Sequence, residues 1–449
     1  MAQDRKVLII VLDAARRDAV HSALRNSTLP ELQQATEVCL LSPSCWTVPS
    51  MGSLVTGLFP SEHGLQWPLA GTAVDEPAMA SLPARVGQRF RIVSANEVYA
   101  PPLIAFPPGT ADFVLRRRPS WVNRALRAMS LADYGGRECL RSVRELLAGG
   151  RVPDLLLVHM VEAHHPYLLP PAGLALRARA AYSRGQFAHV LSKKAQVWEY
   201  AARASAQAWA RAKERYLECL HYSTRLVEQM VQAYKDAGLL EQTLVLVTAD
   251  HGEHLGEHGL ADHQASLYDR LVHVPGLLVG PDLPAVIPGQ FQHTDLLLTC
   301  CNYLGVPLDG YEPAWPPLDM LEPANWERGH EHAFLEWKAW DPKQLASLRR
   351  RNPSYDFGPL HRDLVGVRTR EWKYVRGSDG SRLLLNLRED PDEEHDVLDG
   401  NPEAAAALEA RLEEWRGRVM EAGRRAAAAR MAGETSDVVE QRLQDLGYL

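Results

Sequence analysis

Three short aliphatic runs, each followed at once by acidic residues or histidines, constrain the fold of this chain most. They lie in KVLIIVLDAARRDAV (residues 6–20), PDLLLVHMVE (153–162) and TLVLVTADH (243–251). Continuous apolar runs of this length are typical of strands buried on both faces of a parallel sheet. Because parallel strands end at one edge of a sheet, we expect Asp13 and the polar residues of the other two strand ends to gather there.

Helical periodicity fills the intervals between these strands. Residues 111–149 and 172–238 carry apolar side chains at spacings of three and four with charges between them. Alternating strands and helices predict an α/β fold, a doubly wound and mostly parallel sheet flanked by helices. We assign residues 1–320 to this α/β domain, with 172–215 as a helical insertion. That insertion is rich in Arg, Lys and aromatic residues, so it is interpreted as a solvated helix face or as a lid over the site.

The pattern changes after a Pro-rich passage at 306–325, which we interpret as a linker. Residues 365–377 and 382–387 form short strand patterns joined by Ser-Asp-Gly-Ser, a typical turn sequence. We therefore predict a small antiparallel α+β subdomain over 326–400. The Ala-, Glu- and Arg-rich segment 401–449 is predicted to be a helical tail.

Charge and cysteine usage exclude several classes of protein. Lys and Arg number 49 against 56 Asp and Glu, a net charge of −7 that does not favour nucleic-acid binding. The six cysteines form no C-x-x-C pair, so we expect free thiols in a reducing compartment rather than a disulfide scaffold. The apolar run at 7–12 is too short for a signal peptide or a membrane helix. We expect a cytoplasmic protein without a transmembrane segment, whose oligomeric state stays open.

The most informative stretch is LVLVTADHGEHLGEHGLADH (244–263), in which a buried strand ends in Asp250 and His251 and His263 follows. Carboxylate and imidazole side chains that leave adjacent strand-end positions can converge on one divalent cation. The alternative is a histidine-rich surface loop without a metal.

A second stretch, TVPSMGSLVTG (47–57), places Thr47 at a predicted helix N-terminus, with Pro49 just inside it. Free backbone N–H groups and the positive end of the helix dipole stabilise an anion at such a position. Thr47 is therefore a candidate nucleophile, and the alternative is that its hydroxyl only caps the helix.

A third stretch, VHMVEAHHPY (158–167), puts Glu162, His164 and His165 in the turn after a strand. Two histidines and a carboxylate at a strand end favour a second ligand group. The alternative is that they are packed or solvent-facing polar residues.

Taken together, these motifs resemble the sulfatase-like branch of the alkaline phosphatase superfamily, with threonine as nucleophile as in its phosphodiesterase and phosphonate hydrolase types. The resemblance rests on the strand-end Asp13, T-x-P-S with L-V-T-G, the H-x-P-Y turn, T-A-D-H-G-E with G-E-H-G, and the Leu-Tyr-Asp segment at 267–275. Further similar segments lie at 292–307 and in the predicted C-terminal subdomain. The resemblance covers nearly the whole chain.

The resemblance implies a role for each matching residue. Asp13, Asp250 and His251 match the ligands of the metal that activates the nucleophile, and Thr47 stands at the nucleophile position and would bind that metal. His164 matches the histidine of the H-x-P-Y turn and is the expected second catalytic residue. His263 matches a position that carries a metal-binding histidine in phosphodiesterase relatives. By position, a second metal site would combine these two histidines with a carboxylate, Glu162.

Several departures from the sulfatase pattern change the expected chemistry. Sulfatases of this family carry Cys or Ser in C/S-x-P-x-R, which is oxidised to formylglycine, whereas this chain has Thr47 and, in the place of the arginine, Met51. Threonine cannot become formylglycine by that route. Ala14 also replaces the second acidic residue of the first strand end. An unmodified threonine beside histidines favours phosphoryl over sulfuryl transfer.

The sequence therefore predicts a metal-dependent hydrolase or phosphotransferase that acts on a phosphodiester or phosphonate ester. The expected path uses a metal-bound threonine nucleophile and a covalent intermediate, with one or two divalent ions, Zn²⁺ or Mn²⁺ by ligand type. The expected partner is a small-molecule phosphate or sulfate ester. Two alternatives stay open: a sulfuric-ester hydrolase that uses unmodified threonine, and a catalytically silent, sulfatase-like interaction protein.

Overall fold

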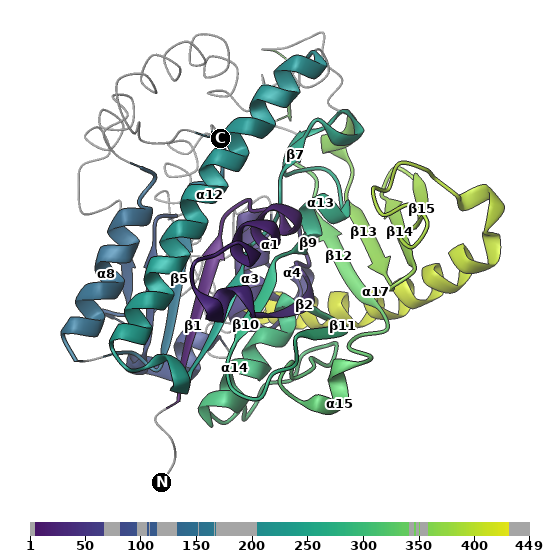
Figure 1. Cartoon of the computed structure of the whole chain (residues 1–449). Helices are drawn as coiled ribbons and strands as arrows, with labels where there is room; N and C mark the ends of the chain where they lie inside the picture. Colours follow the sequence, from purple (N-terminus) through teal and green to yellow (C-terminus); the bar gives the residue numbers. More distant parts are fainter. Residues whose placement is uncertain are drawn as a thin grey trace.

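Three parallel strands lie side by side at the centre of the computed structural model (Figure 1). They are β1 (Lys6–Leu12), β5 (Leu155–Met160) and β6 (Thr243–Thr248), and every residue of the three is buried. β1 runs between the other two, parallel to both. The structure describes residues 5–66, 81–96, 106, 108–114, 133–150, 152–165, 167, 204–340, 345–346, 350 and 358–430.

The central sheet extends outward from these strands in both directions, in the order β11-β2-β10-β6-β1-β5-β3-β4. Among its described strands, β10 runs antiparallel to both of its neighbours, and the short β9 pairs antiparallel with β2. The outer strands are β2 (Thr36–Leu41), β3 (Phe90–Ser94), β4 (Ala111–Phe113), β9 (His273–Val274), β10 (Gly276–Val279) and β11 (Val286–Gln292).

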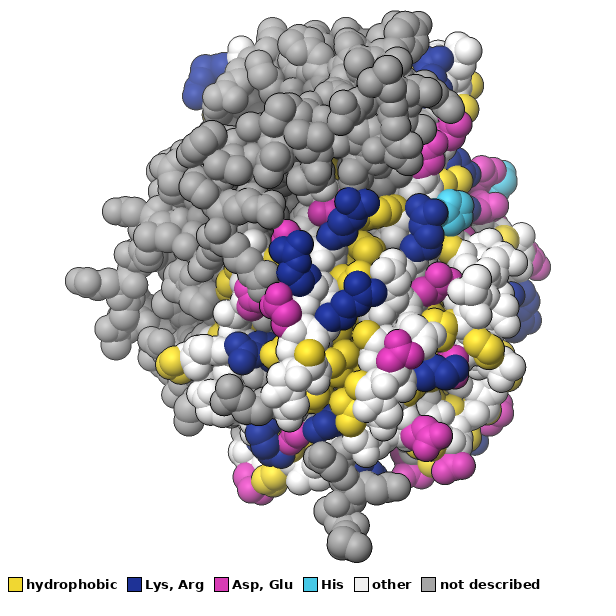
Figure 2. Space-filling model, turned by 60° about the vertical axis from the view of Figure 1, so that its left-hand side comes forward, with side chains coloured by type: hydrophobic (Ala, Val, Ile, Leu, Met, Phe, Trp, Pro, Cys, Tyr) yellow, Lys and Arg dark blue, Asp and Glu magenta, His cyan; other side chains and the backbone are white. Residues whose placement is uncertain are grey.

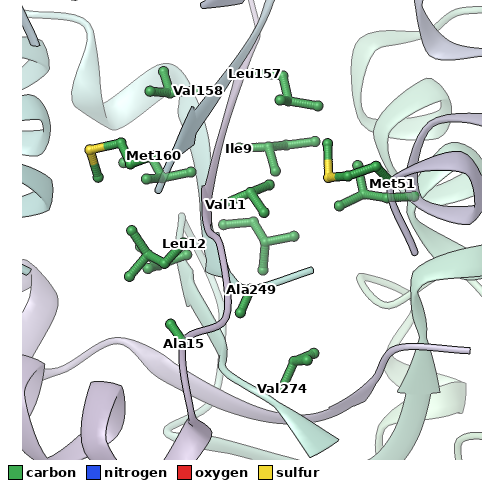
Figure 3. Packing of buried hydrophobic residues seen from close by; sticks show 14 of the residues in the cluster. Ile9, Val11, Leu12, Ala15, Met51, Leu157, Val158, Met160, Ala249 and Val274 are labelled. Atoms are coloured by element: carbon green, nitrogen blue, oxygen red, sulfur yellow. The ribbon is translucent and has the colours of Figure 1, made fainter. Parts of the chain in front are cut away.

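Helices cover both faces of the sheet. One face carries α1 (Arg17–Arg25), α8 (Gly136–Ala148) and α12 (Ala206–Asp236), and the other carries α3 (Thr47–Thr56), α6 (Leu82–Val86) and α14 (Leu296–Leu304). Because strand side chains alternate between faces, Ile9 and Val11 point toward Met51 of α3, whereas Met160 points the opposite way (Figure 3). All ten residues of α3 are buried, so this helix is held on every side.

A second, antiparallel sheet of four strands follows in the chain, in the order β12-β13-β14-β15. The long helix α17 (Pro402–Arg430) runs beneath it (Figure 1). Trp415 of α17 stacks on Phe334 of β12 with ring centroids 4.8 Å apart, and it meets Phe59, beside α4 of the larger domain, at 5.2 Å. The strands and α4 are β12 (Ala333–Trp337), β13 (Leu364–Arg368), β14 (Trp372–Gly377), β15 (Arg382–Asn386) and α4 (Pro60–His63).

The remaining short elements connect these parts. They are α2 (Pro30–Gln33), β7 (His254–Leu255), β8 (Ala261–Asp262), α13 (Asp269–Val272) and α15 (Pro323–Trp326). No helix among the described residues combines the length and apolar character needed to cross a bilayer. On the face in Figure 2, Asp and Glu side chains lie beside the Lys and Arg side chains, so the charges there are mixed in sign.

The predicted fold class is confirmed: a mostly parallel sheet with flanking helices, a small antiparallel sheet and a helical C-terminal region. The helical prediction for 111–149 was too long, because Ala111–Phe113 pairs with β3 as an edge strand and α8 begins at Gly136. The predicted insertion at 172–215 lies outside the described residues up to 203, and its last part belongs to α12. The tail after 430 also lies outside them.

Candidate metal centre and nucleophile

Two strand ends bring three candidate ligands together. Asp13 follows β1 directly, and Asp250 and His251 follow β6, so the parallel pairing of these strands sets them at one edge of the sheet. Their ligand atoms all lie within 4.8 Å of one another. His251 Nε2 is 3.6 Å from Asp13 Oδ1 and 3.4 Å from Asp250 Oδ2. We call these three residues the primary cluster.

Local backbone bonds fix the direction of each ligand. His251 Nδ1 lies 2.8 Å from the carbonyl oxygen of Gly252. Since a carbonyl only accepts, Nδ1 carries the proton, and in the neutral ring the lone pair of Nε2 faces the two carboxylates. Asp250 Oδ1 accepts from the backbone N–H of Ala14 at 3.2 Å, and Ala14 has a left-handed φ of 57°. The turn after β1 therefore orients a ligand that comes from β6.

Thr47 places its hydroxyl against this cluster. Its Oγ1 lies 3.3 Å from His251 Nε2, and the side chain is fully buried. Helix α3 begins at Thr47 itself, after Trp46, which makes no side-chain capping bond. Thr47 is thus the first residue of the helix, whereas the sequence had placed it one position before the helix start. Its hydroxyl faces His251, and the backbone N–H groups of the first turn of α3 can donate hydrogen bonds to an anion bound there.

The primary cluster holds two buried carboxylates, whose negative charges favour a bound cation. Asp13 and Asp250 are both fully buried, and His159 Nε2 lies 3.5 Å from Asp13 Oδ2 and 4.0 Å from Asp250 Oδ2. Burial lowers the pKa of His159 by more than the charge of Asp250 raises it. The resulting pKa is about 4, so this imidazole is neutral at pH 7. Two buried carboxylates and the Nε2 lone pair of His251 are a donor set that fits a divalent ion.

A second group of ligand atoms adjoins the first. His263 Nδ1 lies 2.6 Å from Asp262 Oδ1 and 3.3 Å from Glu253 Oε1, and these three residues are buried. The ring of His263 stacks on that of His251 with centroids 4.2 Å apart. His164 and His165 also bring ligand atoms within 4.8 Å of His263. The structure therefore brings His164 and His263 together in a group of ligand atoms beside the primary cluster.

The two predicted residues of the turn after β5 have different surroundings. His164 is half-buried, and its Nδ1 lies 2.8 Å from the carbonyl oxygen of His165, which leaves Nε2 as the acceptor in the neutral ring. Glu162 instead accepts from the backbone N–H of Gly136 at 2.6 Å, at the start of α8. Burial and the nearby charge of Asp133 raise the pKa of Glu162 to about 8.

Glu162 therefore belongs to none of the clusters that the described residues form. Its carboxyl group lies at the start of α8, where the backbone N–H of Gly136 donates to it. The structure supplies Glu253 and Asp262 as carboxylates beside His263, in the place where the sequence had suggested Glu162.

Sequence reasoning missed some residues that line the site. One is His159, which lies within β5. Another is Asn96, two residues past β3, which donates from Nδ2 to Asp13 Oδ2 at 2.7 Å. A histidine in the middle of a buried apolar strand was the available signal for His159, since an imidazole there needs a polar partner.

Known proteins resemble this chain in sequence and in fold. The family model described as Sulfatase matches residues 5–306. Arylsulfatase K of Bos taurus is 28% identical over 206 residues, which cover 44% of this chain and 35% of that protein. The chain thus spans about a third of the length of the curated relatives it matches.

Solved structures extend the likeness to almost the whole chain. A 2-O GAG sulfatase superposes with a TM-score of 0.69 at 14% identity, covering 94% of each chain. A phosphonate monoester hydrolase from Silicibacter pomeroyi superposes with a TM-score of 0.66 at 17% identity, covering 93% of this chain and 96% of its own. At these identities the two superpositions establish a shared fold.

Proposed function

The chain belongs to the sulfatase family, as its motifs predicted, and on that premise we propose that it is a metal-dependent hydrolase of phosphodiesters or phosphonate esters. The observation that carries the proposal is Thr47 Oγ1, buried at a helix N-terminus and 3.3 Å from His251 Nε2 within the primary cluster. Coordination to a metal ion held by such a ligand set would activate this hydroxyl as a nucleophile.

Asp13, Asp250 and His251 would hold the ion, and its Lewis acidity would lower the pKa of the Thr47 hydroxyl. The mixed carboxylate and imidazole set suits Zn²⁺ or Mn²⁺ better than Mg²⁺ or Ca²⁺. His263, Glu253 and Asp262, whose ligand atoms also lie within 4.8 Å of one another, would hold a second ion of the same type. We propose one resident ion at the primary cluster and a second at His263.

The reaction follows from where the protein's own groups lie. The Thr47 hydroxyl gives its proton to solvent and its oxygen attacks phosphorus in line with the leaving oxygen. The ester P–O bond breaks as the phosphothreonine forms. The N–H groups of the first turn of α3 offset the charge on the non-bridging oxygens. His164, half-buried at the edge of the site, takes up a proton from solvent on Nε2 and gives it to the leaving oxygen. The neutral ring then takes a proton from the water that hydrolyses the phosphothreonine, and Thr47 leaves as its hydroxyl.

The nucleophile type separates phosphoryl from sulfuryl transfer. Formylglycine-dependent cleavage needs an oxidised Cys or Ser, and Cys45, the cysteine next to this helix, is fully buried with its thiol pKa raised by burial. Thr47 therefore acts as an alcohol. An alcohol forms a stable phosphoester intermediate that water can hydrolyse at phosphorus, and this supports the phosphate or phosphonate ester over the sulfate ester.

One experiment compares three substrates with the same leaving group: bis(p-nitrophenyl) phosphate, p-nitrophenyl phenylphosphonate and p-nitrophenyl sulfate. Metal content is measured on the same sample, before and after chelation and after reloading with Zn²⁺ or Mn²⁺. We expect bound metal, activity on the first two esters and loss of that activity with the chelated ion. Turnover of the sulfate alone would favour the sulfuric-ester alternative, and a protein that binds no metal and cleaves none of the three would overturn the proposal.

Two variants distinguish the two metal positions. Asp250→Asn removes a ligand from the primary cluster, and Asp262→Asn removes one from the group around His263. We expect the first to lower both bound metal and activity. If two ions bind, Asp262→Asn lowers the metal content by one ion per chain, whereas an unchanged content indicates a single-metal enzyme.

A further inference from the structure

A cysteine, a histidine and an aspartate form a relay away from the candidate metal centre. Cys39 lies on β2, His273 begins β9 and Asp269 begins α13. Cys39 Sγ is 3.5 Å from His273 Nε2, and His273 Nδ1 is 3.5 Å from Asp269 Oδ2. The imidazole thus faces the thiol with one nitrogen and the carboxylate with the other, the arrangement in which a base activates a nucleophile and a third group orients the base.

The relay is held in place by neighbouring elements. β2 and β9 pair antiparallel, with Leu41 opposite His273, so the sheet itself sets the thiol beside the imidazole. Arg368 of β13 forms hydrogen bonds to both carboxylate oxygens of Asp269, at 3.1 Å and 2.9 Å. Asp269 is therefore fixed, and it keeps His273 directed at the sulfur.

The surrounding charges favour the thiolate. Burial acts to raise the pKa of Cys39, but the positive field and hydrogen bond of His273, with a contribution from Arg368, outweigh it and lower that pKa to about 7. Burial likewise lowers the pKa of His273, and the charges of Cys39 and Asp269 outweigh it and raise that pKa. Other charged and titratable groups around the relay include Lys373, which pairs with Asp269, and Glu393, which accepts from the Asp269 backbone N–H at 2.6 Å. His21, Arg17 and Glu37 form a further group on α1 and β2.

Cys39 also differs from the other cysteines in access. It is half-buried, whereas the remaining cysteines are buried. Burial raises the thiol pKa of each of them for which a shift is resolved, to about 11 for Cys301 and further for Cys300. A thiol must be both ionised and reachable to react, and Cys39 combines a lowered pKa with burial that is less complete than that of the other five cysteines.

We propose that Cys39 is a reactive thiol, a site of covalent modification by electrophilic carbon that His273 and Asp269 activate. His273 takes the thiol proton, and the thiolate sulfur then attacks the carbon and forms a C–S bond. The leaving group departs with the electron pair of the bond that breaks, which is iodide when the electrophile is iodoacetamide. This site is independent of the hydrolase chemistry proposed above.

The test alkylates the folded, full-length protein with iodoacetamide from pH 5.5 to 9.5 and identifies the labelled cysteine by peptide mass spectrometry. We expect Cys39 to be labelled first, with a rate that is half-maximal near pH 7. In His273→Asn the midpoint should rise by at least about one pH unit, so that the rate at pH 6 falls about tenfold. His221→Asn, on the exposed side of α12, is the matched control and should leave the profile unchanged.

Circular dichroism confirms the fold of each variant, and His273→Gln replaces the asparagine variant if that one unfolds. Should neither variant fold, the wild-type profile alone decides, because a midpoint near 8.5 is that of an ordinary thiol. Such a midpoint, an unchanged midpoint in a folded His273 variant, or prior labelling of another cysteine would each overturn the proposal. Cys39→Ser must abolish the fast label for the assignment to stand.

Discussion

Replacing Thr47 with alanine should separate activity from stability. The 3.3 Å contact of its hydroxyl with His251 is long, so its loss should cost about 1 kcal/mol of unfolding free energy, and the lost buried methyl about 1 kcal/mol more. Losing the nucleophile should lower kcat on the order of 10⁴-fold or more. That factor corresponds to a barrier increase of about 5 kcal/mol, well above the loss of stability.

The assay measures kcat with bis(p-nitrophenyl) phosphate and unfolding in urea on the same preparations. Thr56→Ala is the matched control, because Thr56 ends the same helix, is also buried and bonds to the Gly52 carbonyl oxygen at 2.7 Å. Its stability should fall by a similar amount while kcat stays within about twofold of wild type. If Thr47→Ala kept more than about a tenth of the wild-type kcat, Thr47 would not be the nucleophile.

Three further predictions concern other parts of the structure. His164→Gln should lower kcat by about 10²–10⁴ for a phenyl leaving group and less for p-nitrophenyl, which needs no proton; an equal loss for both would exclude a general acid. Lys373→Met leaves buried Glu393, 2.6 Å from the Lys373 nitrogen, without its cation and should cost about 3–5 kcal/mol in urea unfolding, partly recovered by adding Glu393→Leu. Burial lowers the pKa of His21 to about 4, below the unfolded value of about 6.5. The contribution of neutral His21 to the free energy of unfolding is therefore fully present above pH 6.5. It is lost as the pH falls toward 4, because the unfolded protein takes up a proton that the folded protein does not. In His21→Gln, the fall in unfolding free energy between pH 7.5 and pH 5 should be about 2 kcal/mol smaller than in wild type.

The strand ends could be predicted from the sequence because their signal is local. An aliphatic run that stops at Asp13 or at Asp250 indicates both the strand and the strand end where the ligand lies. Because the two strands pair in parallel, both ends lie at the same edge of the sheet. The same reasoning placed Thr47 at a helix start to within one residue. These inferences needed only periodicity and the common direction of the strands.

The direction of side chains in turns could not be predicted in this way. Asp262 points at His263 from a backbone with a φ of 68°, which an aspartate adopts only in particular turns and which no periodicity signals. Glu162 follows a strand end as Asp13 does, yet it turns to the start of α8. Which of two nearby partners a strand-end carboxylate takes depends on the packing of helices that are distant in sequence.

The aromatic contact between α17 and Phe59 has a practical consequence for work on shortened chains. The matched family segment ends at residue 306, but Phe59, just past the helix that presents Thr47, is covered by Trp415 and by Phe334 from beyond that limit. A chain truncated at 306 would lay this aromatic ring open to water, and we expect it to precipitate or self-associate before its catalysis could be measured.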